Sequence, residues 1–285
     1  MSLALHRRAD ISPEQIAALD AALTAFYRNP PSDYYQVADE SSQHYNTQEL
    51  PFHCDLVGRV VPGTTVLELG CGTAHICPHI EAHGGNYTGI DHSEKLLREN
   101  RRRFPRARFL PIGMPLEERF DMVASLYTIE HVVDPVAYLE LMLSYCKPGG
   151  LMGVICPEFV EGDGLAPSVF YGKSPRRLRE KLQALAIYDL CLHLIDWKIL
   201  RARWIRLARQ AAPGAFWINL KPRVLHGASY TIDADAVHLS RLKDLVWYFE
   251  QRGAMIVQTS AKMQSVAPEI LRFNCYLLAR KPTQV

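Results

Sequence analysis

The sequence lacks the features that mark membrane-spanning and secreted proteins. It contains no apolar run of about 18 residues, the length that crosses a bilayer. Residues 1–8 are not followed by an apolar stretch and a cleavage site, so no secretory signal peptide is recognised. The seven cysteines are scattered and never spaced as Cys-x-x-Cys, which is typical of reduced thiols. We therefore expect a soluble, cytoplasmic protein.

Familiar catalytic and metal-binding sets are also missing. The chain shows no Ser-His-Asp set, and the group His75, Cys77, His79 and His83 has no carboxylate in register. A structural zinc ion needs a closed set of four ligands, so we expect no metal site. There are no internal repeats or low-complexity tracts. A length of 285 residues fits one large domain, or one domain with an insertion.

The most informative stretch is residues 65–74. Strand-favouring residues lead into Gly70-Cys71-Gly72, and two glycines let the backbone turn tightly beside a ligand. The next predicted strand ends at Asp91, where an acid can accept hydrogen bonds from both ribose hydroxyls. A dehydrogenase would place a third glycine where Ala74 and His75 stand. The order of strand, glycine turn, helix, strand and acid predicts a nucleoside-binding site.

Strands and helices alternate around this stretch, which predicts a parallel sheet with ligands at the carboxyl ends of its strands. A capped helix from Ser12 to about residue 27 precedes it, and residues 32–50 form a polar arm rich in tyrosine. Residues 147–150 are expected to form a turn. The expected strands are 64–70, 86–91, 107–112, 120–127, 150–156, 255–258 and 273–279, and the expected helices are 50–60, 75–83, 93–103, 135–146 and 239–252.

Residues 158–232 do not fit the alternation and are too long for a loop without structure of its own. We expect one or two helices between 178 and 209, and residues 173–209 hold ten Lys or Arg against three acids. Three interpretations stay open: a lid whose cations bind an acidic substrate, a basic amphipathic surface that contacts a membrane or partner, and ordinary helices with a solvated face. An apolar helix here could equally form a homodimer contact.

At four motifs the chain resembles the class I S-adenosylmethionine-dependent methyltransferases. The motifs are residues 66–73, 89–93, 120–133 and 147–151. The resemblance implies an α/β fold, with helices on both faces of a seven-stranded, mostly parallel Rossmann-like sheet. It also implies an N-terminal helical cap at 1–50, a core at 51–157 and 233–285, and a helical insertion at 158–232. The implied cofactor is S-adenosylmethionine.

The resemblance carries cofactor-binding roles onto particular residues. Asp91 would hold the ribose, Gly70 and Gly72 would admit the methionine portion, and Glu68 would orient it. The family often has an acid after the third strand, but residues 110–115 contain none, so Gly113 or Met114 would replace it by backbone or apolar contact. The implied cofactor-binding set is Glu68, Gly70, Cys71, Gly72, Asp91, His92, Met114 and Leu126.

The resemblance places the transferred methyl group beside the loop after the fourth strand. Tyr127, Glu130 and His131 are therefore the catalytic candidates. An imidazole can take a proton near neutral pH, but His131 could instead brace the loop with Glu130 as its partner. Weaker substrate-binding candidates come from the flanking segments: Tyr45, Glu158, Arg201, His226 and Tyr230.

The sequence thus predicts methyl transfer to a small molecule, on oxygen first, with carbon and nitrogen as alternatives. The acceptor would be sizeable or apolar, with an acidic group facing the arginines. A macromolecular acceptor is the second hypothesis. Residues 126–130 lack the Asn/Asp-Pro-Pro-Tyr/Phe set that grips a nucleic-acid base, and a net charge of +2 gives no phosphate footprint, so no nucleic-acid partner is expected. A third hypothesis is a non-catalytic module that uses the basic insertion.

Overall fold

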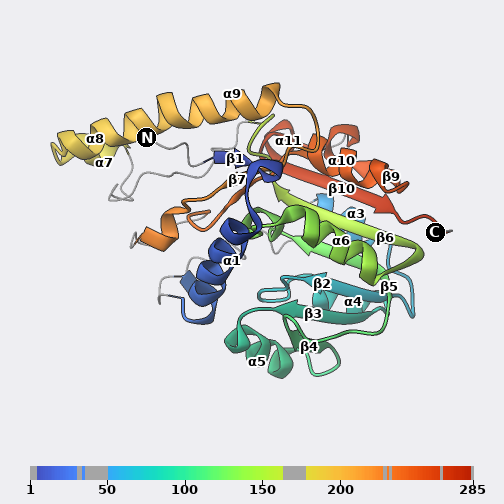
Figure 1. The fold of residues 1–285 in the computed structure, drawn as a ribbon. Helices are drawn as coiled ribbons and strands as arrows, with labels where there is room; N and C mark the ends of the chain where they lie inside the picture. The colour runs from blue at the N-terminus through green and yellow to red at the C-terminus, as the bar shows by residue number, and fades with distance from the viewer. Residues whose placement is uncertain are drawn as a thin grey trace.

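A seven-stranded sheet forms the centre of the molecule (Figure 1). In this computed structural model the described residues are 5–30, 34–35, 51–162, 178–226, 230, 233–263 and 266–283. The strand order is β4-β3-β2-β5-β6-β10-β9. The strands are β2 (Thr65–Leu69), β3 (Asn86–Asp91), β4 (Arg108–Pro111), β5 (Phe120–Leu126), β6 (Cys146–Pro157), β9 (Met255–Thr259) and β10 (Asn274–Arg280).

The sheet is parallel from β4 to β6, while β10 runs antiparallel to both β6 and β9. The predicted fold class is confirmed, including the antiparallel last strand. Parallel neighbours require crossover connections, and α4 (Cys77–Ala82), α5 (Glu94–Arg103) and α6 (Pro135–Tyr145) provide them, while α10 (Leu242–Gln251) leads into β9.

Alternating side chains along each strand build one core on each face of the sheet. Val66 belongs to the core that also holds Phe52 and Leu56 of α3 (Pro51–Val57), together with side chains of α4 and α5. The next residue, Leu67, belongs to the opposite core with side chains of α6 and α10. Helices therefore cover both faces and leave the carboxyl ends of the strands free for a site.

The N-terminal segment packs over those strand ends. Ser12 caps α1 (Pro13–Arg28) through the predicted capping box, because its hydroxyl accepts from the amide of Gln15 and its amide donates to the Gln15 side chain. Before α1, β1 (Leu5–Arg7) joins a second sheet of order β1-β7-β8, and the short 3-10 helix η1 (Arg8–Asp10) links it to α1. Its other strands are β7 (Trp217–Asn219) and β8 (His238–Leu239).

The described part of residues 158–232 contains the expected helices and also a strand. The helices α7 (Leu178–Gln183), α8 (Ile187–Leu194), the π-helical η3 (Ile195–Arg201) and α9 (Ala202–Gln210) form the gold arm of Figure 1. The expected helical insertion at 158–232 also contains the strand β7, which follows the arm and precedes the short helix η4 (Arg223–His226). Three residues are too few to show a strand period in sequence.

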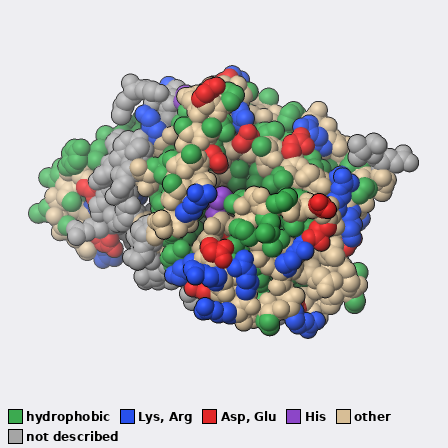
Figure 2. Space-filling model, turned by 60° about the horizontal axis from the view of Figure 1, so that its bottom comes forward, with side chains coloured by type: hydrophobic (Ala, Val, Ile, Leu, Met, Phe, Trp, Pro, Cys, Tyr) green, Lys and Arg blue, Asp and Glu red, His purple; other side chains and the backbone are tan. Residues whose placement is uncertain are grey.

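Apolar side chains lie exposed along the arm, and Leu185 and Tyr188 are 80% and 78% exposed. Figure 2 shows hydrophobic side chains gathered at the left end of the molecule, where Figure 1 places α7 and α8. Across the described residues, no helix combines enough length with enough apolar character to span a bilayer.

The turn expected at residues 147–150 is instead part of β6. Cys146 pairs with Phe120, and the pairing then shifts so that Leu151 stands opposite Met122. Gly149 has a φ of 75°, a left-handed conformation that favours glycine. Lys147-Pro-Gly-Gly150 is therefore an irregularity within the strand pairing, and its composition alone does not distinguish a bulge from a turn. The C-terminal part also contains η5 (Ser260–Lys262) and α11 (Pro268–Phe273).

Candidate active site

A cavity of about 1380 Å³ opens at the carboxyl ends of β2, β3 and β5, and α1, η2 (Ile129–His131) and the segment before β8 complete its wall. Figure 2 shows a hollow near the middle of the face, with a histidine side chain inside it. Most of the predicted site residues line this cavity: Glu68, Gly70, Cys71, Gly72, Asp91, His92, Met114, Leu126, Tyr127, Glu130, His131, Arg201 and Tyr230.

Three predicted substrate residues are not placed in the cavity wall. Glu158 is buried, and its carboxylate accepts hydrogen bonds from the amides of Val160 and Leu242, each at 3.0 Å. The amide of Leu242 is the first of α10, and a carboxylate that accepts from it stabilises the N-terminus of the helix. This role explains why Glu158 is buried. Tyr45 lies outside the described residues. His226 ends η4, and its side chain is also outside the described part.

The two glycines after β2 are required for different reasons. Gly70 has a φ of 74°, and a Cβ there would come within 2.3 Å of the Thr128 side chain. Gly72 has a φ of 49°, and a Cβ there would meet no protein atom within 4 Å among the described residues. Gly70 therefore permits the close packing of two loops. Gly72 lines the cavity beside open space that a ligand can approach.

Asp91, at the end of β3, is fixed by the backbone on both carboxylate oxygens. Oδ2 accepts from the amide of Gly72 and Oδ1 from the amide of Ser93, each at 2.8 Å. Burial raises the pKa of Asp91, while these amide hydrogen bonds oppose the rise. The carboxylate is thus pre-oriented at the cavity edge, and its remaining lone pairs can accept from the two hydroxyls of a ribose.

Glu68 lies deeper, in the middle of the parallel strands. The Tyr87 hydroxyl donates to its Oε2, and both side chains are buried. Burial raises the pKa of Glu68 to about 8, although the hydrogen bond from Tyr87 opposes this. Glu68 therefore joins β2 to β3 as well as lining the cavity.

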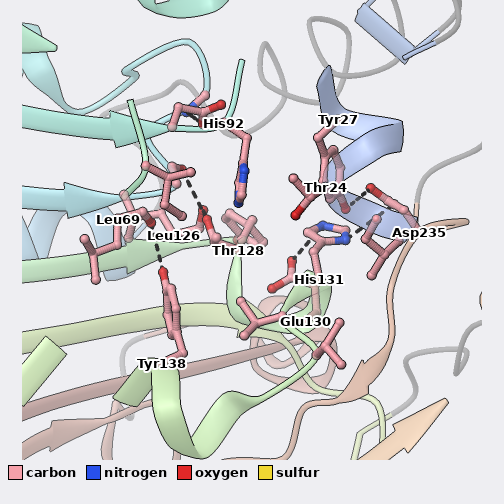
Figure 3. Close-up of a pocket in the computed structure, with 18 of the residues that line it drawn as sticks. Thr24, Tyr27, Leu69, His92, Leu126, Thr128, Glu130, His131, Tyr138 and Asp235 are labelled. Carbon is pink, nitrogen blue, oxygen red and sulfur yellow. Dashed lines mark hydrogen bonds and ion pairs between the residues drawn. The ribbon is translucent and has the colours of Figure 1, made fainter. Parts of the chain in front are cut away.

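The far end of the cavity, where an adenine was predicted, is apolar and open. Ile112 and Met114 are each 46% exposed and line it beside His92. The His92 ring lies 6.1 Å from the Tyr27 ring at an interplanar angle of 28°, so α1 reaches this end as well. In Figure 3 the His92 side chain points down into the space opposite Tyr27 and Thr24.

The loop after β5 is held by hydrogen bonds to the main chain. The Thr128 hydroxyl donates to the carbonyl oxygens of Gly70 and Leu126, at 3.2 and 3.1 Å. Tyr127 has a φ of 51°, which is uncommon for a bulky residue, and its hydroxyl donates to Asn274 at 3.0 Å. Strained residues of this kind cluster at functional sites, and this one directs the chain into η2.

His131 stands at the centre of a polar group on the α1 side of the cavity (Figure 3). Its Nε2 lies 3.7 Å from Glu130 Oε1, and its Nδ1 lies 3.4 Å from Asp235 Oδ1. Asp235 is buried and also accepts from the hydroxyls of Tyr27 at 2.7 Å and Tyr230 at 3.1 Å. The catalytic candidates Glu130 and His131 are therefore together, as predicted.

Asp233 adds another carboxylate next to this pair. One donor atom each from Glu130, His131 and Asp233 lies within 4.8 Å of the others. Burial raises the pKa of Asp233 to about 6, and His131 opposes the rise. Burial also raises the pKa of Glu130 well above its usual value. The α1 side of the cavity thus gathers acidic side chains, which the sequence did not indicate.

Arg201 lines the cavity but is already engaged by an acid. Its Nε and a terminal nitrogen donate to Asp196 Oδ2 at 2.9 and 2.6 Å, and Asp196 is buried. The ion pair joins the two ends of η3. The charge of Arg201 is therefore already paired within the protein and does not require an acidic substrate.

Sequence reasoning missed Tyr27, Asp233 and Asp235. The Asp-Ala-Asp spacing is visible in the sequence, but residues 233–235 form a turn and nothing local connects them to η2 or α1. The contact between Tyr27 and Asp235 spans 208 positions, so only the folded chain reveals it.

Comparison with known proteins identifies a family. The sequence model described as a methyltransferase domain matches residues 42–259, which is most of the chain. Among curated proteins, the tRNA U34 carboxymethyltransferase of Idiomarina loihiensis is 35% identical over 113 residues, 35% of each chain. A ubiquinone biosynthesis O-methyltransferase of Rhodopseudomonas palustris is 33% identical over 99 residues, 32% of this chain and 39% of the relative. The chain thus spans well under half of the length of these two relatives.

Solved structures share the fold at low sequence identity. The 1,6-didemethyltoxoflavin-N1-methyltransferase of Burkholderia thailandensis superposes with a TM-score of 0.53 at 14% identity, covering 95% of this chain and 91% of that one. An S-adenosylmethionine-dependent methyltransferase of Mesorhizobium loti gives a TM-score of 0.51 at 17% identity, covering 82% and 98%. At such identities the likeness concerns the fold alone.

Proposed function

The chain belongs to the methyltransferase-domain family and has the Rossmann-like fold of class I S-adenosylmethionine-dependent methyltransferases. On this premise we propose that it binds S-adenosylmethionine in the cavity and methylates a small-molecule acceptor. The reacting atom of the acceptor is an oxygen first, with nitrogen and carbon as alternatives. When bound, S-adenosylmethionine supplies a methyl group on a sulfonium, which is already activated for transfer.

The single observation that carries the proposal is the pre-oriented carboxylate of Asp91 beside the open space at Gly72. The Gly72 amide holds Asp91 Oδ2 at 2.8 Å, so the two residues form one unit at the cavity edge. A ribose fits this unit because its hydroxyls are donors and the carboxylate is an acceptor. Ile112 and Met114 offer apolar contact to an adenine, although no acid follows β4 to bind its amino group.

We place the acceptor on the α1 side, against the loop after β5. Tyr127, Glu130 and His131 bound this side together with Tyr230. Methyl transfer depends mainly on the alignment of the acceptor with the sulfonium, and a hydroxyl acceptor must also lose its proton. A ring nitrogen of His131 can accept this proton directly, or it can bind a cation that holds the acceptor.

The conclusive experiment is calorimetric titration of S-adenosylhomocysteine and S-adenosylmethionine into the protein and its Asp91→Ala variant. We expect binding to the natural chain and a loss of at least ten-fold in affinity in the variant, since hydrogen bonds to a carboxylate contribute about 1.5–3 kcal/mol each. Glu94→Ala is the control, because this exposed acid of α5 pairs only with Arg101 among the contacts described. Equal affinity in all three proteins would reject the placement of the ribose at Asp91.

A labelled methyl donor then tests the acceptor class. Small phenols, amines and carboxylic acids are compared with total tRNA at the same donor concentration. Label in the small-molecule fraction alone supports the proposal, while label in RNA alone would favour the macromolecular hypothesis. Nucleoside binding without transfer to any acceptor would favour a non-catalytic module.

A further inference from the structure

We propose that Glu130, His131 and Asp233 form a binding site for a divalent metal ion on the acceptor side of the cavity. The site itself follows from these side chains alone. Its role, which is to hold the reacting oxygen of the acceptor, rests on the proposed methyl transfer.

The three residues provide a compact donor set from two distant parts of the chain. Glu130 and His131 lie in η2, and Asp233 follows the insertion. One donor atom from each lies within 4.8 Å of the other two. A movement of about an ångström would bring all three to the 2.0–2.2 Å at which nitrogen and carboxylate oxygen bind Zn²⁺. Imidazole with two carboxylates suits a first-row transition ion better than Ca²⁺ or Mg²⁺.

The burial of the carboxylate of Glu130 provides independent support. Its side chain is 1% exposed, and within the described part of the chain its Oε2 has no hydrogen-bond partner. A buried polar atom without a partner is costly and rare in folded proteins. A cation between Glu130 and Asp233 would supply the missing partner and offset the repulsion between the two carboxylates.

Asp235 orients the histidine as a second layer of the site. It lies 3.4 Å from His131 Nδ1, so this nitrogen faces a carboxylate and Nε2 is left toward Glu130, 3.7 Å away. Metal-binding histidines commonly turn the second ring nitrogen to a carboxylate in this way. The hydroxyls of Tyr27 and Tyr230 in turn fix the two oxygens of Asp235. Figure 3 shows His131 between Glu130 and Asp235, with Tyr27 behind.

An ion held by three residues keeps coordination positions for substrate. All three residues line the cavity, so those positions face the space assigned to the acceptor. A hydroxyl bound to such an ion loses its proton at lower pH than a free one. The site therefore favours an acceptor whose reacting hydroxyl is a metal ligand, and most of all one with a second oxygen on the neighbouring carbon.

The test is calorimetric titration of Mn²⁺ and Zn²⁺ into chelator-treated protein, alongside the variants His131→Ala and Asp233→Asn. We expect one ion per chain in the natural protein and a loss of at least ten-fold in affinity in each variant. Asp235→Asn, which changes only the second layer, is expected to weaken binding by about 10–100-fold. S-adenosylhomocysteine binding by each variant reports that the fold is intact.

A matched control removes the competing histidine pair His79 and His83, of which the first lies in α4 and the second is the residue that caps its C-terminus. Ion binding that disappears in the His79→Ala/His83→Ala variant and persists in Asp233→Asn would overturn the proposal. Absence of ion binding by a protein that binds S-adenosylhomocysteine would also overturn it and leave the proposed function standing. Ion binding without any nucleoside binding would instead support the site and reject the proposed function.

Discussion

The hydroxyl of Tyr27 donates a 2.7 Å hydrogen bond to Oδ2 of Asp235, although 208 positions separate the two residues. The bond joins α1 to the segment that follows the insertion. Asp235 is buried and Tyr27 is half-buried, and burial raises the pKa of Tyr27 well above its usual value, with the nearby Asp235 adding to the rise. The N-terminal helix is therefore bonded to the wall of the cavity as well as packed against it.

Replacement of Tyr27 by phenylalanine should lower the free energy of unfolding by about 2 kcal/mol, because a hydrogen bond to a buried carboxylate is lost and its acceptor stays buried. Urea denaturation followed by circular dichroism measures the change. Tyr188→Phe is the control, since that side chain is 78% exposed on the arm. Equal midpoints for the two variants would show that the Tyr27 hydroxyl contributes nothing.

Gly72→Ala should fold but bind S-adenosylhomocysteine poorly. The new methyl group meets no described protein atom within 4 Å and projects at the cavity wall, while a φ of 49° costs about 1–2 kcal/mol for alanine. Gly63→Ala is a matched control, because Gly63 has a φ of 87°, equally free space and no place in the cavity lining. Calorimetry would contradict the prediction if both variants bound the nucleoside equally well.

Gly70→Ala should behave differently and lose stability. A Cβ at this position comes within 2.3 Å of Thr128 Cγ2, so the loop after β5 must shift. The variant Thr128→Ala removes both Cγ2 and Oγ1, which would lie 2.3 and 2.5 Å from the new Cβ, so Gly70→Ala should cost less stability in this background than in the natural chain. Thermal unfolding of the two single variants and the double variant decides the point, and an equal cost in both backgrounds would rule out the clash as the cause.

Glu68→Gln should flatten the dependence of stability on pH. The folded-state pKa of Glu68 is about 8, against about 4.3 in an unfolded chain, so the folded protein favours the protonated form. The stability that this form provides is present at low pH and is lost as pH rises from about 4.3 through 8. Glutamine stays neutral, and its side-chain oxygen can still accept from Tyr87. Urea midpoints from pH 5.5 to 8.5 test this, and parallel curves for the two proteins would refute it.

Arg201→Ala should destabilise the protein by about 3–5 kcal/mol, because it leaves the buried Asp196 without the guanidinium that accompanies it here. The double variant Arg201→Leu/Asp196→Leu removes both charges and should lie closer to the natural protein. Arg203→Ala, an exposed neighbour on α9, should have little effect. Unfolding midpoints check this order. If the Arg201→Ala variant were fully stable, the ion pair would not explain this arginine, and Arg201 would again be a candidate substrate ligand.

The central sheet could be predicted from sequence because its signals are local. Residues 65–69 form a strand-favouring run that leads into glycines, and Asp91 ends the next strand, so both elements and their order were recognisable. Four motifs at ordinary spacing identified the nucleoside side of the cavity in the same way. The irregular pairing at Gly149 was not predicted, since proline and glycine are common to turns and bulges alike.

The acceptor side could not be predicted because it depends on contacts between distant segments. Strands of two and three residues, such as β8 and β7, carry no measurable period. Asp235 contacts His131 and Tyr27 only after α1, η2 and the segment before β8 have come together. Arg201 was assigned to a substrate because its charge is visible in sequence, whereas its burial beside Asp196 is not.

The pairing of β1 with β7 also constrains the order in which parts of the chain can fold during synthesis. Leu5 pairs with Asn219, so the first strand must wait until more than 200 further residues have been made. At about 5–20 residues per second, this delay is roughly 10–40 s. The turn at Gly72 and β3, which ends at Asp91, are synthesised much earlier. The part of the cavity that we assign to the nucleoside is therefore made well before the segment that completes the α1 side, which we assign to the acceptor.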